Sequence, residues 1–217
     1  MTDHDFLGAA RTFYDTIAAD YAEWIRGELD AKPLDRAMLA AFAELAGATG
    51  PIADVGCGPG RVTAHLDSLG VDAFGLDLSP QMVALARQAY PGLRFEEGSM
   101  TGLDLADASL GGIVAWYSII HVPQDRLPAV FAEFHRVLAP GGRLLLAFQV
   151  GDEPLHLENP MGHPVALDFH RQRPDHIAGL LEAAGITLTA RLVREPGDDE
   201  LGAKIPQAYL LARKPAA

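Results

Sequence analysis

The stretch PIADVGCGPGRV, residues 51–62, places a short apolar run directly before a turn that holds three glycines and a proline in five positions. The apolar run is typical of a buried strand, and Val62, Leu66 and Leu69 then keep helical spacing. In open α/β folds such a strand-to-helix turn lies at the carboxyl edge of the sheet, where ligands bind. Missing side chains let ligand atoms touch the backbone. The stretch therefore predicts a ligand-binding turn in an α/β fold.

Strand-like and helix-like segments alternate along the first 150 residues. Strands are expected at residues 51–55, 72–77, 93–98, 111–118 and 143–150, and helices at 34–46, 62–69, 79–89 and 124–138. In the first of these helices, an apolar stripe at helical spacing is expected to face the core: Leu34, Met38, Phe42 and Leu45. Apolar strands separated by helices predict right-handed crossovers and a parallel sheet covered on both faces.

The pattern changes after residue 150. Residues 151–173 are polar, with prolines at 154, 160 and 164, which indicates an excursion outside the sheet. A helix ending at Gly185 follows, and strand-like runs at 187–195 and 206–214, joined by an acidic turn, predict an antiparallel pair. With 217 residues and 49% hydrophobic content, we expect a single domain over residues 1–217. Residues 1–33 form its N-terminal helical cap and residues 151–173 its substrate-side insertion.

Composition excludes several classes of protein. The formal net charge is −12 and no basic cluster occurs, so nucleic acid is not an expected partner. No apolar stretch reaches the roughly 18 to 20 residues of a membrane helix, and the N-terminus lacks a secretory pattern, so we expect no membrane partner and a cytoplasmic location. Cys57 is the only cysteine, which excludes an intramolecular disulfide and a cysteine-based zinc site.

Two carboxylates flank the glycine turn and indicate the kind of ligand. Asp54 precedes the glycines, and Asp77 ends the second strand, where an acid can accept hydrogen bonds from both hydroxyls of a ribose. The dinucleotide motif G-x-G-x-x-G seats a pyrophosphate, but here the glycines are spaced two and two, and a carboxylate beside a pyrophosphate is unfavourable. Asp54 suits a ligand with an ammonium group and a sulfonium, as in S-adenosylmethionine.

Five segments in order carry a family resemblance: DVGCGPGRV, GLDLSPQMVALAR, EEGSMTGLDL, GGIVAWYSIIHV and EFHRVLAPGGRLLLAF. Together they resemble the class I S-adenosylmethionine-dependent methyltransferases, in particular the small-molecule branch, over roughly residues 10–213. The resemblance implies a Rossmann-like α/β fold: a seven-stranded, mostly parallel sheet with an antiparallel last strand and helices on both faces. It also implies S-adenosyl-L-methionine as cofactor and methyl transfer to an oxygen, nitrogen or carbon atom of a small molecule.

The resemblance also assigns the residues of the cofactor site. The glycine turn lines the methionine and ribose portions with Asp54 near the ammonium group, Asp77 binds the ribose, and Leu78 and Met82 contact the adenine. Many relatives have an acid where this chain has Ser99, so the Met100 backbone N–H is an alternative contact for the adenine. Tyr14 and Tyr21 share a helix face, which ordinary packing would also produce. The full expected set is Tyr14, Tyr21, Asp54, Gly56, Cys57, Gly58, Pro59, Gly60, Asp77, Leu78, Met82, Ser99, Met100, Tyr117 and Ser118.

Histidines supply the candidates for catalysis and for contacts with the methyl acceptor. His121 follows the fourth strand, where a neutral imidazole near its ordinary pKa of about 6.5 could take a proton from a nucleophile, or could serve as a loop hydrogen bonder. Among the later histidines, the spacing contains no i, i+4 pair, so we expect no metal site. We expect residues 151–173 to form a wall or lid over the site, with His156, His163 or His170 facing the pocket.

Other functions remain as alternatives. A non-catalytic, regulatory S-adenosylmethionine-binding module would keep the same pocket. A short-chain nicotinamide oxidoreductase needs Tyr-x-x-x-Lys, and no tyrosine of the chain has a lysine four residues later. A nucleic-acid amino methyltransferase would resemble Asn/Asp-Pro-Pro-aromatic at the end of the fourth strand, where this chain has AWYSIIH. We expect a small-molecule methyl acceptor as the partner, and a homodimer is a candidate assembly.

Overall fold

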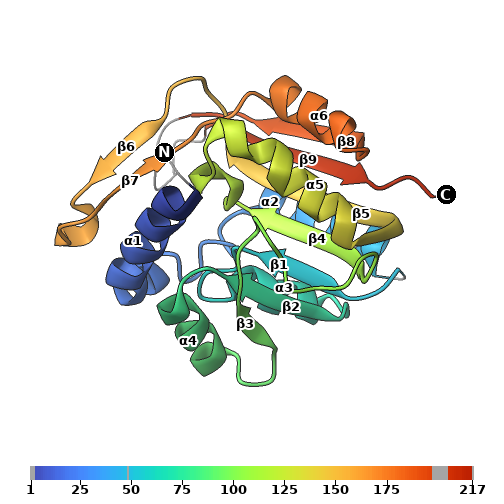
Figure 1. Cartoon of the computed structure of the whole chain (residues 1–217). Helices are drawn as coiled ribbons and strands as arrows, with labels where there is room; N and C mark the ends of the chain where they lie inside the picture. Colours follow the sequence, from blue (N-terminus) through green and yellow to red (C-terminus); the bar gives the residue numbers. More distant parts are fainter. Residues whose placement is uncertain (1–2, 48, 197–204, 217) are drawn as a thin grey trace.

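A seven-stranded sheet with helices on both faces forms the centre of this computed structural model, which describes residues 3–47, 49–196 and 205–216 (Figure 1). The α-helices are α1 (Asp3–Trp24), α2 (Pro33–Ala46), α3 (Arg61–Ser68), α4 (Pro80–Ala89), α5 (Leu127–Val137) and α6 (Pro174–Ala183). The strands are β1 (Ile52–Val55), β2 (Ala73–Asp77), β3 (Phe95–Glu97), β4 (Leu110–Trp116), β5 (Leu138–Gln149), β6 (Leu155–Glu158), β7 (Ala166–Phe169), β8 (Thr187–Arg194) and β9 (Gln207–Arg213). Short 3₁₀ helices are η1 (Ile119–His121), η2 (Gln124–Arg126) and η3 (Pro160–Gly162).

The order of the strands confirms the predicted fold class. The sheet runs β3-β2-β1-β4-β5-β9-β8, and β1 to β5 pair in parallel. Strand β9 runs antiparallel to both of its neighbours, β5 and β8. The acidic turn expected between β8 and β9 lies mostly at residues 197–204, outside the described residues. Because the chain moves outward from β1 to β3 and then returns to add β4, the sheet has its topological switch point between β1 and β4, where ligands bind.

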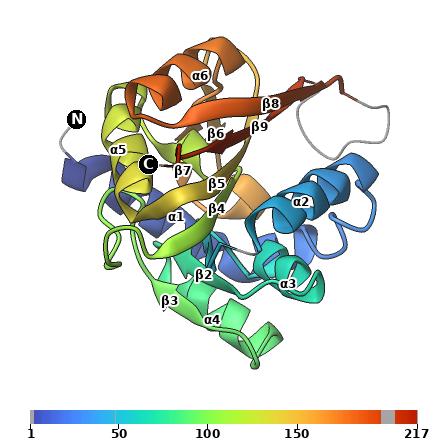
Figure 2. The same cartoon turned by 90° about the vertical axis from the view of Figure 1, so that its right-hand side faces the viewer.

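Helices cover both faces of the sheet, as predicted (Figure 2). On one face α5 and α6 bury Phe131, Phe134 and Ile177 against the sheet. On the other face α2 and α3 bury Phe42 and Leu66. Strand β4 is buried along its whole length, which explains why its sequence is an almost continuous apolar run.

Helix α2 forms where the sequence predicts it, but it turns a different face to the core. Leu39 and Phe42 are fully buried, whereas Leu34 and Leu45 are 47% and 43% exposed. Rotation of the helix away from the predicted stripe brings Asp35 inside, where its Oδ1 accepts a hydrogen bond of 2.7 Å from the Tyr209 hydroxyl on β9. A partner distant in sequence therefore decides which face of α2 is buried.

Residues 151–173 lie outside the main sheet and contain the two-stranded hairpin β6–β7. The hairpin packs on α1, with Leu167 buried against Phe13 and Ile17. Helix α1 in turn contacts α4 and the end of β2 (Figure 1). Within the described residues, no helix has the length and apolar character needed to span a membrane.

Candidate functional site

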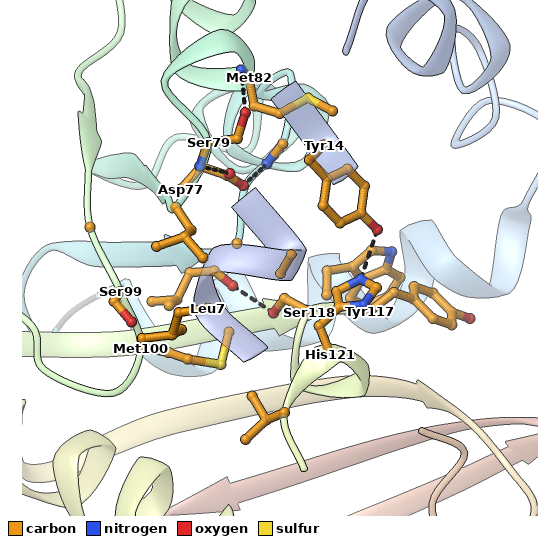
Figure 3. Close-up of a pocket in the computed structure, with 18 of the residues that line it drawn as sticks. Leu7, Tyr14, Asp77, Ser79, Met82, Ser99, Met100, Tyr117, Ser118 and His121 are labelled. Atoms are coloured by element: carbon orange, nitrogen blue, oxygen red, sulfur yellow. Dashed lines mark hydrogen bonds between the residues drawn. The ribbon is translucent and has the colours of Figure 1, made fainter. Parts of the chain in front are cut away.

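A cavity lies at the carboxyl ends of β1, β2 and β4, beneath α1 (Figure 3). It encloses about 780 Å³, counted with the space open to solvent, which suits a small-molecule ligand. Its wall combines the glycine turn after β1, the β2–α4 junction, the loop after β3, and the segment from the end of β4 to η1. Tyr14 and Tyr21 reach it from α1.

Steric contacts explain the glycines of the turn after β1. Gly56 has φ +79°, and a Cβ built there would lie 2.3 Å from Ser118 Cβ, at the end of β4. Gly60 has φ +85° and would bring a Cβ within 2.8 Å of the Phe95 ring. Gly58 has φ +54° and open space where a Cβ would lie. The turn therefore needs glycine at Gly56 and Gly60 for close approach, and at Gly58 for backbone conformation.

Asp77 presents its carboxylate at the end of β2. Its Oδ2 accepts a hydrogen bond from Gly58 N at 2.7 Å, and its Oδ1 accepts one from Ser79 N at 2.8 Å. Burial raises the pKa of Asp77 to about 6, while the two backbone N–H groups oppose that rise. Each carboxylate oxygen retains lone pairs for a further donor, because a carboxylate offers about four acceptor positions. The two backbone bonds fix the carboxylate toward the cavity.

Asp54 does not line the cavity, which corrects its expected place beside a ligand ammonium group. The side chain is fully buried beneath the turn, and its Oδ2 accepts a hydrogen bond from Thr63 Oγ1 on α3 at 2.7 Å. Its Oδ1 has no hydrogen-bond partner among the described residues. Burial raises the pKa of Asp54 to about 7, although Thr63 lowers it. The structure thus gives Asp54 a position behind the turn.

Three further residues of the expected cofactor set also lie outside the cavity lining: Cys57, Pro59 and Gly60. The Cys57 thiol packs with Val83 and Phe95 in a small core beneath the turn. A Cβ built at Gly60 would likewise meet the Phe95 ring and Ala86 Cβ, within 2.8 Å and at 3.1 Å. Cys57 and Gly60 therefore serve the packing of α4 and β3 against the turn.

The remaining expected residues come together in the lining. They are Tyr14, Tyr21, Gly56, Gly58, Asp77, Leu78, Met82, Ser99, Met100, Tyr117, Ser118 and His121. The sequence analysis missed Phe6, Leu7, Ala10, Val55, Ser79, Gly98, Trp116 and Val122. The α1 members of this second set lie at helical spacing with Tyr14, so periodicity could have found them.

The electrostatic character of the lining is simple. Among the described residues that line this cavity there is no lysine or arginine, and Asp77 is the only acid. Much of the wall is apolar and includes Phe6, Leu78, Met82 and Met100. The cavity therefore favours a ligand that combines an apolar or aromatic part with positive charge.

His121 and Tyr14 form a partly buried pair in the cavity wall, with 2.7 Å between His121 Nε2 and the Tyr14 hydroxyl (Figure 3). Burial, assisted by nearby His170, lowers the pKa of His121 to about 3. Burial also raises the pKa of Tyr14 well above its ordinary value. Both groups are therefore neutral at pH 7, and His121 is a much weaker proton acceptor here than the ordinary pKa of the sequence argument suggests. The pair connects α1 to η1.

Tyr117 follows β4 in a conformation that non-glycine residues rarely adopt, with φ 55°. Such strain at the edge of a binding site costs on the order of 1–3 kcal/mol and persists only where surrounding structure holds it. Here the Tyr117 hydroxyl lies 3.3 Å from the Tyr209 hydroxyl, and Tyr117 N donates to Ala147 O at 2.9 Å. These bonds hold Tyr117 in place, and the residue lines the cavity.

The three histidines of the hairpin region do not line the cavity, contrary to expectation. His156 Nδ1 lies 2.6 Å from Asp168 on the exposed outer surface of the hairpin, and His163 Nε2 lies 2.6 Å from Asp20 on α1. His170 donates its backbone N–H to Ile120 O at 2.7 Å. Over the described part of the chain, no group of three or more His, Cys, Asp or Glu side chains could hold a metal ion.

Residues 52–142 match the family model described as a methyltransferase domain. A demethylmenaquinone methyltransferase from Chlorobaculum parvum is 33% identical over 130 residues, which are 59% of this chain and 51% of that protein. The chain thus aligns with about half the length of this curated relative.

Two solved structures share the fold. The CcbJ methyltransferase of Streptomyces caelestis has a TM-score of 0.70 at 20% identity, over 93% of this chain and 97% of that chain. The 1,6-didemethyltoxoflavin-N1-methyltransferase of Burkholderia thailandensis, solved with 1,6-didemethyltoxoflavin and S-adenosylhomocysteine, has a TM-score of 0.70 at 21% identity, over 99% and 91%. At such identities the likeness extends to the fold and leaves the substrate open.

Proposed function

We propose that this chain, which belongs to the class I S-adenosylmethionine-dependent methyltransferases, binds that cofactor in the cavity beneath α1 and transfers its methyl group to a small molecule. The methylated atom is an oxygen, nitrogen or carbon. The substrate and the complete activity are proposals, because the match with the curated relative covers only part of that protein.

The observation that carries the proposal is the charge of the cavity lining. Asp77 is its only acid, and no described lining residue is a lysine or arginine. A pyrophosphate would bring negative charge next to this carboxylate. Two like charges about 5 Å apart repel by about 3 kcal/mol at an effective dielectric constant of about 20. A sulfonium and an ammonium group experience attraction of the same order, so the cavity favours S-adenosylmethionine over a dinucleotide.

The residues present fit such a cofactor. Asp77 would accept hydrogen bonds from the ribose hydroxyls, since its carboxylate is held in place by Gly58 N and Ser79 N. Leu78 and Met82 would contact the adenine. Ser99 and Met100 lie beside them in the lining, so either a serine hydroxyl or the backbone could meet the adenine amino group.

S-adenosylmethionine supplies an already activated methyl group when bound, so the main task of the protein is to position the acceptor. Holding reacting atoms about 3 to 3.5 Å apart in line can supply several kcal/mol of the barrier reduction. Tyr14, His121 and Tyr117 surround the space next to the glycine turn where the acceptor atom would lie. Because His121 is neutral and weakly basic, we assign it the role of orienting Tyr14 rather than that of a strong general base.

The domain organisation follows from the same proposal. Residues 1–33 would close the cofactor cavity through α1, and residues 151–173 would support that closure because the β6–β7 hairpin packs on α1. Phe169, at the end of β7, contacts both Phe13 and His121, with ring centroids 6.0 Å and 4.8 Å apart. The hairpin therefore forms an outer wall of the site.

Calorimetric titration tests the cofactor assignment. S-adenosylmethionine and S-adenosylhomocysteine are expected to bind, and NAD is not. Asp77→Asn should weaken both at least tenfold, because a hydrogen bond to a charged group contributes about 1.5–3 kcal/mol. Asp72→Asn is the matched control, since Asp72 is exposed just before β2, at the opposite edge of the sheet. Equal affinity of wild type and Asp77→Asn would remove the ribose assignment.

Transfer of a radiolabelled methyl group to a panel of small acceptors tests the activity itself. Tight cofactor binding without transfer to any acceptor would favour the regulatory module instead. Three expectations stay predictions: a cytoplasmic location, the absence of a nucleic-acid partner and a homodimeric assembly.

A further inference from the structure

A second cavity lies beside the first and shares a wall with it. Tyr14, Tyr21 and Tyr117 line both cavities. The second cavity encloses about 740 Å³, counted with the space open to solvent. Away from the shared wall it reaches Gln149 at the end of β5 and Arg194 at the end of β8. It therefore covers the half of the sheet edge that the first cavity does not reach.

Arg194 supplies a positive charge that the surrounding structure holds in place. Its Nε donates a hydrogen bond of 3.2 Å to the Tyr209 hydroxyl and lies 3.8 Å from Asp35 Oδ1. Its side chain is only 13% exposed, and it lines the second cavity. Because Tyr209 also bonds to Asp35 at 2.7 Å, the anchor of this guanidinium is itself fixed. A guanidinium fixed in a cavity wall is suited to bind a carboxylate.

Gln149 provides the second, independent observation. Its side chain lines the second cavity, and its Oε1 is buried without a hydrogen-bond partner among the described residues. Neighbouring Gln207 differs, because its Nε2 donates to Ile205 O at 2.9 Å. Buried amide oxygens in folded proteins are nearly always hydrogen-bonded. The Gln149 oxygen is therefore able to accept a hydrogen bond from a ligand that carries an N–H or O–H donor.

Aromatic rings form the sides of the second cavity. Tyr14 and Tyr21 pack edge to face with centroids 5.6 Å apart, Tyr21 and Trp24 lie 5.9 Å apart, and Phe169 lines the cavity as well. Rings in such walls favour a planar, aromatic ligand over a flexible aliphatic one, because ring pairs add to the energy of simple burial.

We propose that the second cavity is the methyl-acceptor site and that it binds an aromatic carboxylic acid bearing a hydroxyl or amino group. The carboxylate would lie on Arg194, the hydroxyl or amino group would donate its hydrogen to Gln149 Oε1 with a lone pair turned toward the shared wall, and the ring would pack among the aromatic side chains. Attack of that oxygen or nitrogen on the cofactor's methyl carbon would break the methyl–sulfur bond, leave S-adenosylhomocysteine and release the proton to solvent. This inference rests on the proposed function, because it makes the shared wall of Tyr14, Tyr21 and Tyr117 the place where acceptor and cofactor meet.

The amino-acid carboxylate of the cofactor is another anion that could approach these cations. The same cavity is also lined by an ion-paired cluster next to the glycine turn: Arg61 Nη2 lies 2.7 Å from Glu28 Oε2, and Lys32 Nζ lies 2.6 Å from Glu28 Oε1. Arg61 begins α3 directly after Gly60, whereas Arg194 lies on the far side of β5 and β9. Substituting each arginine in turn therefore distinguishes binding of the acceptor carboxylate from binding of the cofactor carboxylate.

Protein saturated with S-adenosylhomocysteine is titrated with para-hydroxybenzoate, its neutral analogue para-hydroxybenzamide, and benzoate. Wild type should bind para-hydroxybenzoate at least tenfold more tightly than the amide. Arg194→Gln should remove that preference, and Arg194→Lys should keep part of it. Arg213→Gln, at the exposed far end of β9, is the control and should behave as wild type. Wild type should also prefer para-hydroxybenzoate to benzoate, and Gln149→Leu should abolish that preference.

Thermal melting and S-adenosylhomocysteine affinity check that each variant is folded. Equal binding of the acid and the amide by wild type would overturn the inference. So would an Arg194→Gln variant that loses S-adenosylhomocysteine affinity while Arg61→Gln keeps it, because Arg194 would then serve the cofactor. Failure of wild type to bind S-adenosylhomocysteine at all would instead overturn the proposed function.

Discussion

Replacing Gly56 by alanine tests whether the glycine turn is built for close approach of two strands. The new methyl group would lie 2.3 Å from Ser118 Cβ, and the residue would keep φ +79°. The positive φ costs an alanine about 1–2 kcal/mol. Overpacking at a site that cannot give way costs about 1–3 kcal/mol more. We therefore expect Gly56→Ala to lower the free energy of unfolding by about 2–5 kcal/mol.

Gly58→Ala is the matched control because it separates the two contributions. Gly58 has φ +54°, but no atom lies within 4 Å of a Cβ built there. This variant should carry only the conformational cost of about 1–2 kcal/mol. Urea denaturation of both variants, with unchanged m values, measures the difference directly.

A double variant identifies the atom responsible. Ser118→Gly removes the Cβ that the alanine would meet, although it also removes the bond from Ser118 Oγ to Val55 O at 2.6 Å. The two changes together should therefore cost less than the sum of the single variants, by about 1–3 kcal/mol. Equal destabilisation by Gly56→Ala and Gly58→Ala, or additive effects in the double variant, would refute the steric explanation.

Three further predictions follow from the hydrogen bonds and buried carboxylates of the site. Burial raises the pKa of Asp77 to about 6, so this acid is increasingly protonated below that pH. The affinity for S-adenosylmethionine should therefore rise as pH increases from about 5 to about 8, and a calorimetric pH series measures that rise. Because the pKa of Asp54 is raised to about 7, the folded state binds the Asp54 proton more tightly than the unfolded chain does. The free energy of unfolding should therefore increase as pH falls from about 8 to about 5. Denaturation experiments should show a smaller increase for Asp54→Asn. Tyr14→Phe should lower the free energy of unfolding by about 1 kcal/mol because it removes the hydrogen bond to His121. Tyr21→Phe should change that free energy little, since no hydrogen bond of the Tyr21 hydroxyl is present among the described residues. Equal effects of the two substitutions would contradict the pairing of Tyr14 with His121.

The sequence by itself determined those features that depend on neighbours along the chain. Apolar runs separated by helical stripes predicted the parallel sheet, and the glycines after Val55 predicted the turn at its carboxyl edge. Asp77 was predicted to lie beside the glycine turn because it ends β2. The carboxyl ends of two paired parallel strands meet at the same edge of the sheet, so a residue that ends β2 lies next to the turn that follows β1. Strand and helix periods are local, so sequence spacing is enough to find them.

Tertiary structure decided which way individual side chains face. Asp54 turns behind the glycine turn to Thr63, and Asp35 turns into the core because Tyr209, 174 residues later, offers it a hydrogen bond. The second cavity combines residues from α1, β5, β8 and β9, which no spacing along the chain relates. Burial, hydrogen bonds between distant elements and the charge of a cavity wall all depend on which surfaces pack together. A one-dimensional pattern carries little of that information, so the glycine turn was predictable and the second cavity was not.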